Sequence, residues 1–418
     1  MSPQRDPDDL GGLEERLRRT FHGERPDVDV ESFLGNVHRG ARRHRRRQVI
    51  GGAVATVAVI GLGAYGVTAA GLFDDNGTPA ADQTTAPVRT TSSAPGTATS
   101  TETPPPGQRA LSLSATDSER QYVLVAGRFG CRGDCLAAYI TDDAGRSWSA
   151  TSPLGLRPAD PDPTDTTAYA IRFADSSNGW VFGGGLRATH DGGRTWTTPK
   201  LPARGIVTTL EAWGDRVYAG VEDYTTETTT LVGSPVDQDA WVTIDVGQKL
   251  NNVTEMAVSK DLVAVLASPT PLSEGNEILI STDGQQWTTS PDPCSSAQWP
   301  NSVSTSADSL WTVCSSSVGS AVYVSTDAGD SWTVVPGEFF PGSLVQARDD
   351  STAVVVDSNE PGVSIVTVKN QPQHILDDRG DLLPIGFTNP TTGYLRTGDG
   401  GILRTLDSGA TWQDYPLP

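Results

Sequence analysis

The sequence predicts an all-β fold, a seven-bladed β-propeller, from a recurring turn motif, the spacing of its copies and the strand pattern between them. The motif Ser/Thr-x-Asp-x-Gly-x-x-Trp occurs at 141–148, 189–196, 325–332 and 405–412, and a copy one residue shorter runs over 281–287. Its Asp can accept hydrogen bonds from backbone N–H groups of the turn, its Gly can adopt the positive φ that the turn requires, and its Trp covers the hairpin with an apolar ring. The residues predicted to hold these turns are Asp143, Gly145, Trp148, Asp191, Gly193, Trp196, Asp283, Gly284, Trp287, Asp327, Gly329, Trp332, Asp407, Gly409 and Trp412.

The spacing of the motif counts the repeating units. The five aspartates are separated by 48, 92, 44 and 80 residues, so two gaps are single periods and two are double. A period in the forties with four strands per unit is typical of a β-propeller. Each double gap is expected to hide a degenerate unit, the first around 234–241, which keeps an Asp and a Trp, and the second around strands at 353–357 and 363–368. Residues 109–418 therefore contain seven predicted units, with six or eight as alternatives.

Strand patterns within the units agree with this count. In the second unit, β-branched and aromatic residues predict strands at 168–173, 179–184 and 186–189, followed by a strand from Trp196. The last unit repeats the arrangement, with strands expected at 385–387, 393–397, 402–405 and 412–415. The 44 Gly and 29 Pro residues fit a fold of short strands joined by many turns.

The motif is identified as the Asp-box, or BNR repeat. The chain resembles the Asp-box propellers of sialidases, sortilin-type receptor ectodomains, some glucanases and photosystem II assembly-factor-like proteins, and the run from Phe173 to Trp196 most resembles the last group. This resemblance implies that the motif lies at hairpins on the outer rim, away from the central channel where ligands bind. It predicts the fold and leaves the function to be argued separately.

A membrane anchor is expected before the repeats. The cluster Arg42–Arg47, interrupted only by His44, precedes 25 uncharged residues at 49–73, which as a helix would span about 37 Å. The arginines favour a cytoplasmic N-terminus, so residues 109–418 would lie outside a bacterial cell membrane. A cleaved signal peptide is the alternative, but its charged and apolar regions would both be unusually long.

The segments that flank the predicted span are polar. Residues 1–48 are expected to form a cytoplasmic tail, partly helical, that either lies near the membrane or docks a cytoplasmic partner. Residues 74–108 are rich in Thr, Ser and Pro and have few large apolar side chains, which predicts a disordered linker.

The distribution of charge argues against nucleic acid as a partner. The formal net charge of the chain is −20, and residues 1–48 hold 11 Arg and 9 acidic residues. Subtraction leaves 20 basic and 42 acidic residues in 49–418, a net charge of −22. Such a body repels phosphate backbones and anionic membrane surfaces.

A surface glycoside hydrolase of exo-sialidase type is the alternative function. Such an enzyme needs arginines that clamp a substrate carboxylate, and the nearest match to its Arg-Ile-Pro signature is 156–158, in a loop after the first motif. Arginines near predicted strands are Arg172, Arg187, Arg396 and Arg404. Nothing in the sequence brings these four together, and spacing alone does not reveal a catalytic carboxylate pair.

The four cysteines, all beyond the predicted span, are expected to form two disulfides. Cys131–Cys135 would close a hairpin tip, and Cys294–Cys314 would tie a loop to a strand and stabilise the fold by about 3 kcal/mol. The spacing lacks the further ligands of a zinc site, and only His190 and His374 lie outside the tail. Neither a metal nor a cofactor is predicted.

The sequence therefore favours a membrane-anchored, extracytoplasmic propeller that binds an unknown protein or glycan, with or without signalling through the tail. A scaffold for envelope assembly is a further alternative. The repeats predict the architecture and do not name the ligand.

Overall fold

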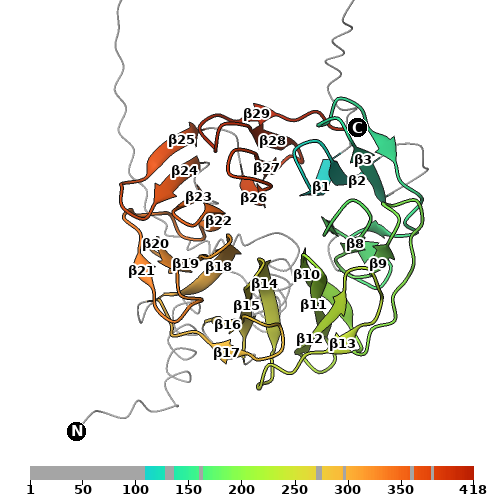
Figure 1. Ribbon diagram of the computed structural model, residues 1–418, viewed down its shortest axis with the longest axis horizontal. Coiled ribbons are helices and arrows are strands. Elements are labelled where there is room, and N and C mark those ends of the chain that lie inside the picture. The colour runs from blue at the N-terminus through green and yellow to red at the C-terminus, as the bar shows by residue number, and fades with distance from the viewer. Residues whose placement is uncertain are drawn as a thin grey trace, which may run out of the picture.

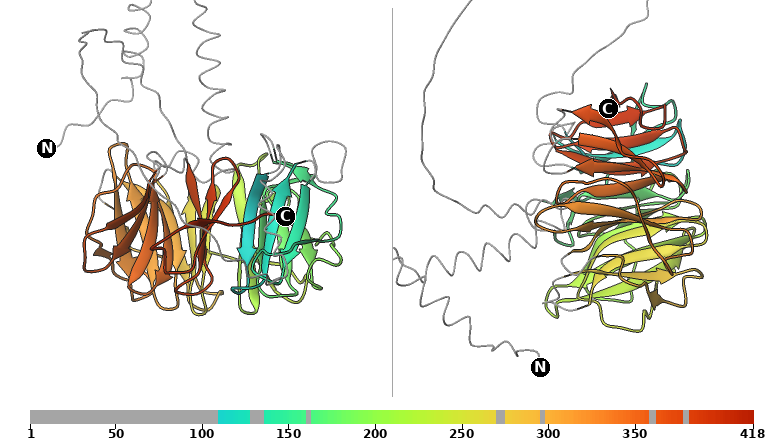
Figure 2. Two further views of the ribbon diagram at one scale, coloured as in Figure 1. Left: turned by 90° about the horizontal axis from the view of Figure 1, so that it is seen from above. Right: turned by 90° about the vertical axis from the view of Figure 1, so that its left-hand side faces the viewer.

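The computed structural model describes residues 109–127, 136–159, 163–269, 275–294, 298–357, 362–377 and 381–418. They form seven β-sheets arranged as the blades of a ring (Figure 1), and the ring is a flat disc when seen from its side (Figure 2). The predicted tail, span and linker at 1–48, 49–73 and 74–108 lie outside the described residues. Within the described part of the chain, no helix has the length and apolar character needed to cross a membrane.

The blades follow one another along the chain, and each is an antiparallel meander. In blades 1 and 3 the strands are β1 (Arg109–Ala115), β2 (Gln121–Ala126), β3 (Leu136–Thr141), β4 (Ser149–Ala150), β10 (Ile206–Trp213), β11 (Arg216–Asp223), β12 (Thr228–Pro235) and β13 (Val242–Thr243). Blade 2 has β7 (Ala170–Phe173), β8 (Gly179–Phe182) and β9 (Arg187–Thr189), and its fourth strand is reduced to a bridge between Ala188 and Thr197. A parallel pair, β5 (Arg157–Pro158) and β6 (Thr167–Ala168), lies between blades 1 and 2 in sequence.

Blades 4 to 7 each have four strands. They are β14 (Asn252–Val258), β15 (Val263–Ser268), β16 (Glu277–Ser281), β17 (Thr288–Thr289), β18 (Trp299–Thr305), β19 (Leu310–Ser315), β20 (Ser320–Ser325), β21 (Thr333–Val334), β22 (Leu344–Asp349), β23 (Thr352–Asp357), β24 (Gly362–Thr367), β25 (Gln373–Asp377), β26 (Leu382–Phe387), β27 (Gly393–Thr397), β28 (Ile402–Thr405) and β29 (Gln413–Asp414). Figure 1 shows the first strand of these blades nearest the ring centre and the last on the rim.

The prediction of seven blades is confirmed, and both degenerate units are complete blades. Blade 3 contains 234–241, and blade 6 contains the strands expected at 353–357 and 363–368. The strand expected at 179–184 ends at Phe182 because Gly183 and Gly184 adopt positive φ values of 109° and 130°. Instead of extending the strand, these two glycine N–H groups bond the carbonyl of Val207 in blade 3.

The core lies between blades, because each sheet has a neighbour on both faces. The second strands show this most clearly, since every residue of β2, β19 and β23 is buried. Between blades 5 and 6, for example, Trp311 and Val313 pack with Val345 and Val355. A strand that is covered on both faces has apolar residues at successive positions and lacks the alternation of a half-exposed strand. This explains the largely apolar sequences of the second strands.

The ring closes between blades 7 and 1 without any exchange of strands. Both blades consist of consecutive strands, so side chains and loops make the joint. Tyr415 is 4% exposed, its hydroxyl bonds Gln121, and the guanidinium of Arg404 lies 4.9 Å from its ring centroid. Trp148 Nε1 donates to the carbonyl of Pro416 at 3.1 Å. Tyr415 is therefore the central contact of the closing seam.

We expect Tyr415→Ala to open this seam. Loss of a buried aromatic side chain from a well-packed site costs about 3–5 kcal/mol of unfolding free energy. Urea unfolding followed by tryptophan fluorescence measures the change. Trp213→Ala is the control, since Trp213 is 53% exposed and its loss should change stability by less than about 1 kcal/mol. Equal effects of the two substitutions would contradict the role of the seam.

Candidate functional site

Each of the five motif turns, called box turns below, is a closed hydrogen-bonded unit. In blade 5, Asp327 Oδ1 accepts the N–H of Ser331 at 2.9 Å and the hydroxyl of Ser325 at 2.7 Å. The N–H of Gly329 donates to Ser325 Oγ at 2.7 Å, and Gly329 has a φ of 84°. These hydrogen bonds, led by the one from the Ser331 hydroxyl, lower the pKa of Asp327 to about 2. The Asp is fully occupied in holding its own turn.

The other box turns repeat this arrangement. The N–H four residues after the Asp donates to its Oδ1 at 2.8 Å in blades 1, 2 and 7, from Ser147, Thr195 and Thr411. In the shorter turn of blade 4, the N–H groups of Gln285 and Gln286 donate to Asp283 Oδ1 at 2.8 and 2.7 Å. The carboxylates of these aspartates therefore have a structural role, because their hydrogen bonds hold the turns.

The box tryptophans of blades 2 and 5 are hydrogen-bonded to the segment that follows the preceding blade. Trp196 Nε1 donates to Thr151 Oγ1 of the blade 1–2 connection at 3.4 Å, and Trp332 Nε1 donates to Ser290 Oγ, just after blade 4, at 3.0 Å. A side chain at Gly329 would clash with Ile280 of blade 4, so this turn also packs tightly on the preceding blade. The box turns thus join blades as well as hairpins.

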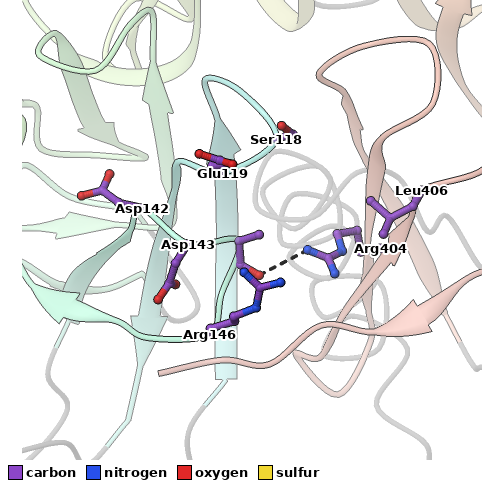
Figure 3. Close-up of a pocket in the computed structure, with 8 residues that line it drawn as sticks. Ser118, Glu119, Asp142, Asp143, Arg146, Arg404 and Leu406 are labelled. Carbon is purple, nitrogen blue, oxygen red and sulfur yellow. Dashed lines mark hydrogen bonds between the residues drawn. The ribbon is translucent and has the colours of Figure 1, made fainter.

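A hollow of about 370 Å³ lies beside the first box turn, at the seam between blades 7 and 1 (Figure 3). Three of its five charged side chains have partners within the fold. Asp143 holds the box turn, Asp142 pairs with Arg120, and Arg404 donates to the carbonyl of Ala144 at 3.2 Å, the dashed line of Figure 3. The hollow therefore belongs to ring closure.

The central channel is the larger cavity, with a volume of about 1420 Å³, and all seven blades line it. In an antiparallel meander, the turns after the first and third strands share one edge. The first strands therefore end at the face that carries the box turns, termed the box face, and begin at the opposite face. The channel connects the two faces along these first strands.

One position of the first strand carries a polar ring around the channel. In six blades the pairing of the first two strands shifts by one residue, a β-bulge, and in all of these except blade 6 the ring residue lies two positions after the shift. In blades 2 and 6, contacts across the blade interface identify the equivalent residue. The polar ring consists of Ser114, Arg172, Glu211, Ala257, Ser304, Gln346 and Thr388, all of which line the channel.

Two carboxyl groups lie in adjacent blades of the channel wall. Glu211 on β10 is ion-paired with Arg172, and burial nevertheless raises its pKa. Glu255 on β14 accepts the N–H of Val303 through Oε2 at 2.8 Å. Burial raises the pKa of Glu255 to about 8, and repulsion from Glu211 adds to this effect. Burial therefore favours the protonated form of Glu255 at neutral pH, while Glu211 lies beside the guanidinium of Arg172.

The channel mouth on the opposite face differs from the polar ring. Arg109 is the first residue of β1, and Arg396 is paired with Leu383 near the start of β26, so both lie at this mouth. Burial, and the proximity of Arg109, lower the pKa of Arg396. Trp299 and Tyr224 line the same mouth and are 39% and 38% exposed. Glu222, which pairs with the first residue of β10, and Glu227, in the turn after β11, also line the channel at this end. This mouth therefore offers aromatic surface and charges of both signs.

The disulfide Cys294–Cys314 is confirmed, with a Cα–Cα distance of 5.4 Å. It ties the segment before β18, five residues from Trp299, to β19. Cys131 and Cys135 lie outside the described residues. No group of three His, Cys, Asp or Glu side chains suited to a metal occurs in the described residues.

Only part of this site follows from the sequence. Of the arginines noted near strands, Arg172 and Arg396 line the channel, whereas Arg187 bonds the carbonyl of Leu154 and Arg404 belongs to the seam. Sequence reasoning missed Glu211 and Glu255. The available signal was a single acidic residue inside each of two predominantly apolar strands, IVTTLEAW and NVTEMAV.

Comparison with solved structures gives the propeller fold. The computationally designed protein Ika8 superposes with a TM-score of 0.50 at 11% identity, over 74% of this chain and 88% of that one. YCF48 bound to a D1 peptide superposes with a TM-score of 0.49 at 14% identity, over 72% of this chain and 93% of that one. The GH74 xyloglucanase from Xanthomonas campestris superposes with a TM-score of 0.48 at 14% identity, over 74% of this chain and 61% of that one. At these identities the likeness concerns the fold alone. No protein-family model and no curated protein matches the chain.

We expect Asp327→Ala to destabilise one turn and leave the channel unchanged. The substitution removes the acceptor of the bonds from Ser325 and Ser331, so the urea midpoint should fall. Asp330→Ala, on the exposed part of the same turn, is the matched control and should keep the wild-type midpoint. Because the pKa of Asp327 is lowered, its stabilisation is present above about pH 4 and disappears as the pH falls through about 2. A midpoint difference that does not shrink on acidification would contradict this account.

Glu255 should make the wild-type protein less stable as the pH rises, opposite to the effect of Asp327, and Glu255→Gln should remove this dependence. Because the folded-state pKa is about 8 against 4.5 in the unfolded chain, wild-type stability should fall between these pH values, by at most about 1.4 kcal/mol per pH unit. The glutamine variant lacks this slope and should gain on the wild type up to about pH 8. Urea titrations across the range test this, and parallel profiles for the two proteins would show that Glu255 is ionised at neutral pH.

Proposed function

We propose that the propeller is a binding module that takes an extracytoplasmic protein segment or glycan into its central channel. The predicted span at 49–73 would present it outside a bacterial cell membrane, on the linker at 74–108. The single observation that carries this proposal is the channel of about 1420 Å³, with a polar ring inside and exposed Trp299 and Tyr224 at one mouth.

The chemistry of the channel suits a polar, extended ligand. Typical small-molecule pockets measure about 300–1000 Å³, so this channel has room for several sugar units or peptide residues. Five of the seven residues of the polar ring are uncharged. All of these except Ala257 carry a hydroxyl or amide group that can form hydrogen bonds with sugar hydroxyls or peptide groups. Aromatic side chains such as Trp299 add large, rigid contact area at low entropic cost.

The mouth on the opposite face is the better candidate for ligand entry. It carries two arginines, Arg109 and Arg396, beside Trp299 and Tyr224, whereas at the box face the end of β10 supplies only the exposed Trp213. Arginine and aromatic side chains are the residues most enriched in binding hot spots. A ligand would therefore meet these groups first and reach the polar ring afterwards.

The geometry favours binding over the exo-sialidase alternative. A carboxylate clamp needs several free guanidinium groups at one point, but Arg172 is already paired with Glu211. Ser114 accepts the N–H of Phe173, which puts Arg172 at the level of Ser114 in the polar ring. Arg109 precedes Ser114 by five residues on β1, about 16 Å away along the strand.

Occlusion of the channel tests the proposal. Thr254 is an exposed bulge residue of β14 that lines the channel, so Thr254→Trp should fill it without entering the core. With the full chain on glycan and peptide arrays, we expect selective binding that Thr254→Trp weakens about tenfold or more. Thr288→Trp, on the exposed outer strand of the same blade, is the matched control and should bind like the wild type.

Three results would contradict the proposal. The first is equal binding by both tryptophan variants, which would put the ligand outside the channel. The second is the absence of any selective binding on either array. The third is turnover of fluorogenic sialosides that Thr254→Trp abolishes, which would favour the hydrolase.

A further inference from the structure

We propose that the channel wall between blades 3 and 4 is a subsite for an organic ammonium group. The inference rests on the channel-binding function proposed above and names a chemical group of its ligand. The wall is formed by β10 and β14, the first strands of adjacent blades, which carry Glu211 and Glu255.

The first reason is a carboxyl group without a counter-charge. Glu255 accepts the N–H of Val303 through Oε2 and is close to the hydroxyl of Ser302, both on β18. Among the described residues, the charged groups facing it are Glu211 on β10, which repels it, and Arg172 on β7, which is already paired with Glu211. A cation beside a partly buried carboxyl group of this kind favours its charged form. A ligand cation would supply the missing partner.

The second reason is independent of charge. Thr208 lines the channel and is 2% exposed, and its Oγ1 has no hydrogen-bond partner among the described residues. Thr209 Oγ1, Asn251 Oδ1 and Asn252 Oδ1 are further buried atoms without a partner in the described part of the chain, and their residues, on or beside β10 and β14, also line the channel. Each of these oxygens can accept a hydrogen bond, and the two asparagine oxygens can only accept. A primary ammonium brings three donors and no acceptor, which suits oxygens that lack a donor.

The rest of the channel directs a cation to this wall. Arg109 and Arg396 lie on blades 1 and 7 and repel it from their side. Trp299 and Tyr224 at the mouth offer aromatic faces, which attract ammonium groups. The net charge of −22 outside the tail, 20 basic against 42 acidic residues, attracts cations over a longer range.

Binding at this wall is coupled to a proton. Below about pH 8, Glu255 is protonated in the free protein, and an ammonium stabilises its carboxylate form. The event is then Glu–COOH plus R–NH₃⁺ giving the ion pair Glu–COO⁻···⁺H₃N–R plus a released H⁺. Affinity should therefore rise with pH up to about 8, and fewer protons should be released at higher pH.

Calorimetry on the full chain tests the inference with simple probes. Cadaverine, a five-carbon diamine, is compared with 1,5-pentanediol, which has the same length and no charge, in two buffers of different ionisation enthalpy. We expect cadaverine to bind more tightly than the diol and to release up to one proton below the pKa of Glu255. A capped Ala-Lys-Ala tripeptide distinguishes the source of the amine, because tighter binding than cadaverine indicates a peptide-borne lysine and weaker binding a free amine.

Substitution assigns the effect to this wall. Glu255→Gln should weaken cadaverine binding about tenfold or more and abolish proton release, while its amide oxygen can still accept the N–H of Val303. Glu338→Gln makes the same charge change at an exposed residue away from the channel and should bind like the wild type. Thermal unfolding of both variants checks that they are folded.

The outcomes separate this inference from the proposed function. Equal affinity for cadaverine and the diol, or wild-type cadaverine binding by Glu255→Gln, would overturn the ammonium subsite. If the same protein still binds array ligands in a manner blocked by Thr254→Trp, the channel function stands and only the subsite is lost. If Thr254→Trp changes neither the binding of array ligands nor the binding of cadaverine, the proposed channel function itself is wrong.

Discussion

The first strand of every blade has one edge without a strand neighbour, and the structure depends on how the groups along that edge are satisfied. Buried backbone N–H groups require partners. Side chains of the preceding blade supply them: Ser114 accepts the N–H of Phe173 at 2.8 Å, Glu255 that of Val303 at 2.8 Å, and Ser304 that of Ala347 at 3.0 Å. The same contacts join neighbouring blades near the axis, as the box tryptophans do at the rim. Blade geometry and channel chemistry are therefore set by the same residues.

This double role limits where the channel can vary. A residue that bonds the next blade can be exchanged only for one that keeps the same acceptor, whereas a bulge residue is free of pairing in its own strand. The bulge residues of five blades all line the channel: Leu111, Thr208, Thr254, Asn301 and Ile385. They differ in size and polarity although their position is shared. Specificity for a ligand can be built at these positions at little cost to the fold.

Architecture could be predicted from the sequence because it depends on local signals that recur. An Asp, a Gly and a Trp at fixed spacing specify a turn through contacts within eight residues, and the spacing then counts the blades, even where blades 3 and 6 lack the motif. The channel site depends on contacts between residues such as Arg172 and Glu211, which are 39 positions apart, and on bulges that no residue type marks. A lone Glu in a strand has the same sequence signature whether it faces solvent or a channel. Only the closed ring distinguishes the two.

Glu255 shows how a structural bond and a binding group can share one side chain. Its Oε2 is committed to Val303, so the group cannot leave the wall, whatever its charge state. That bond favours the carboxylate, while burial and the neighbouring Glu211 favour the acid, and burial is the largest of these effects. Nothing in the fold requires the negative charge, since an amide oxygen would hold the same N–H. The ring would close around a glutamine just as well, so the carboxyl group at this position points to chemistry within the channel.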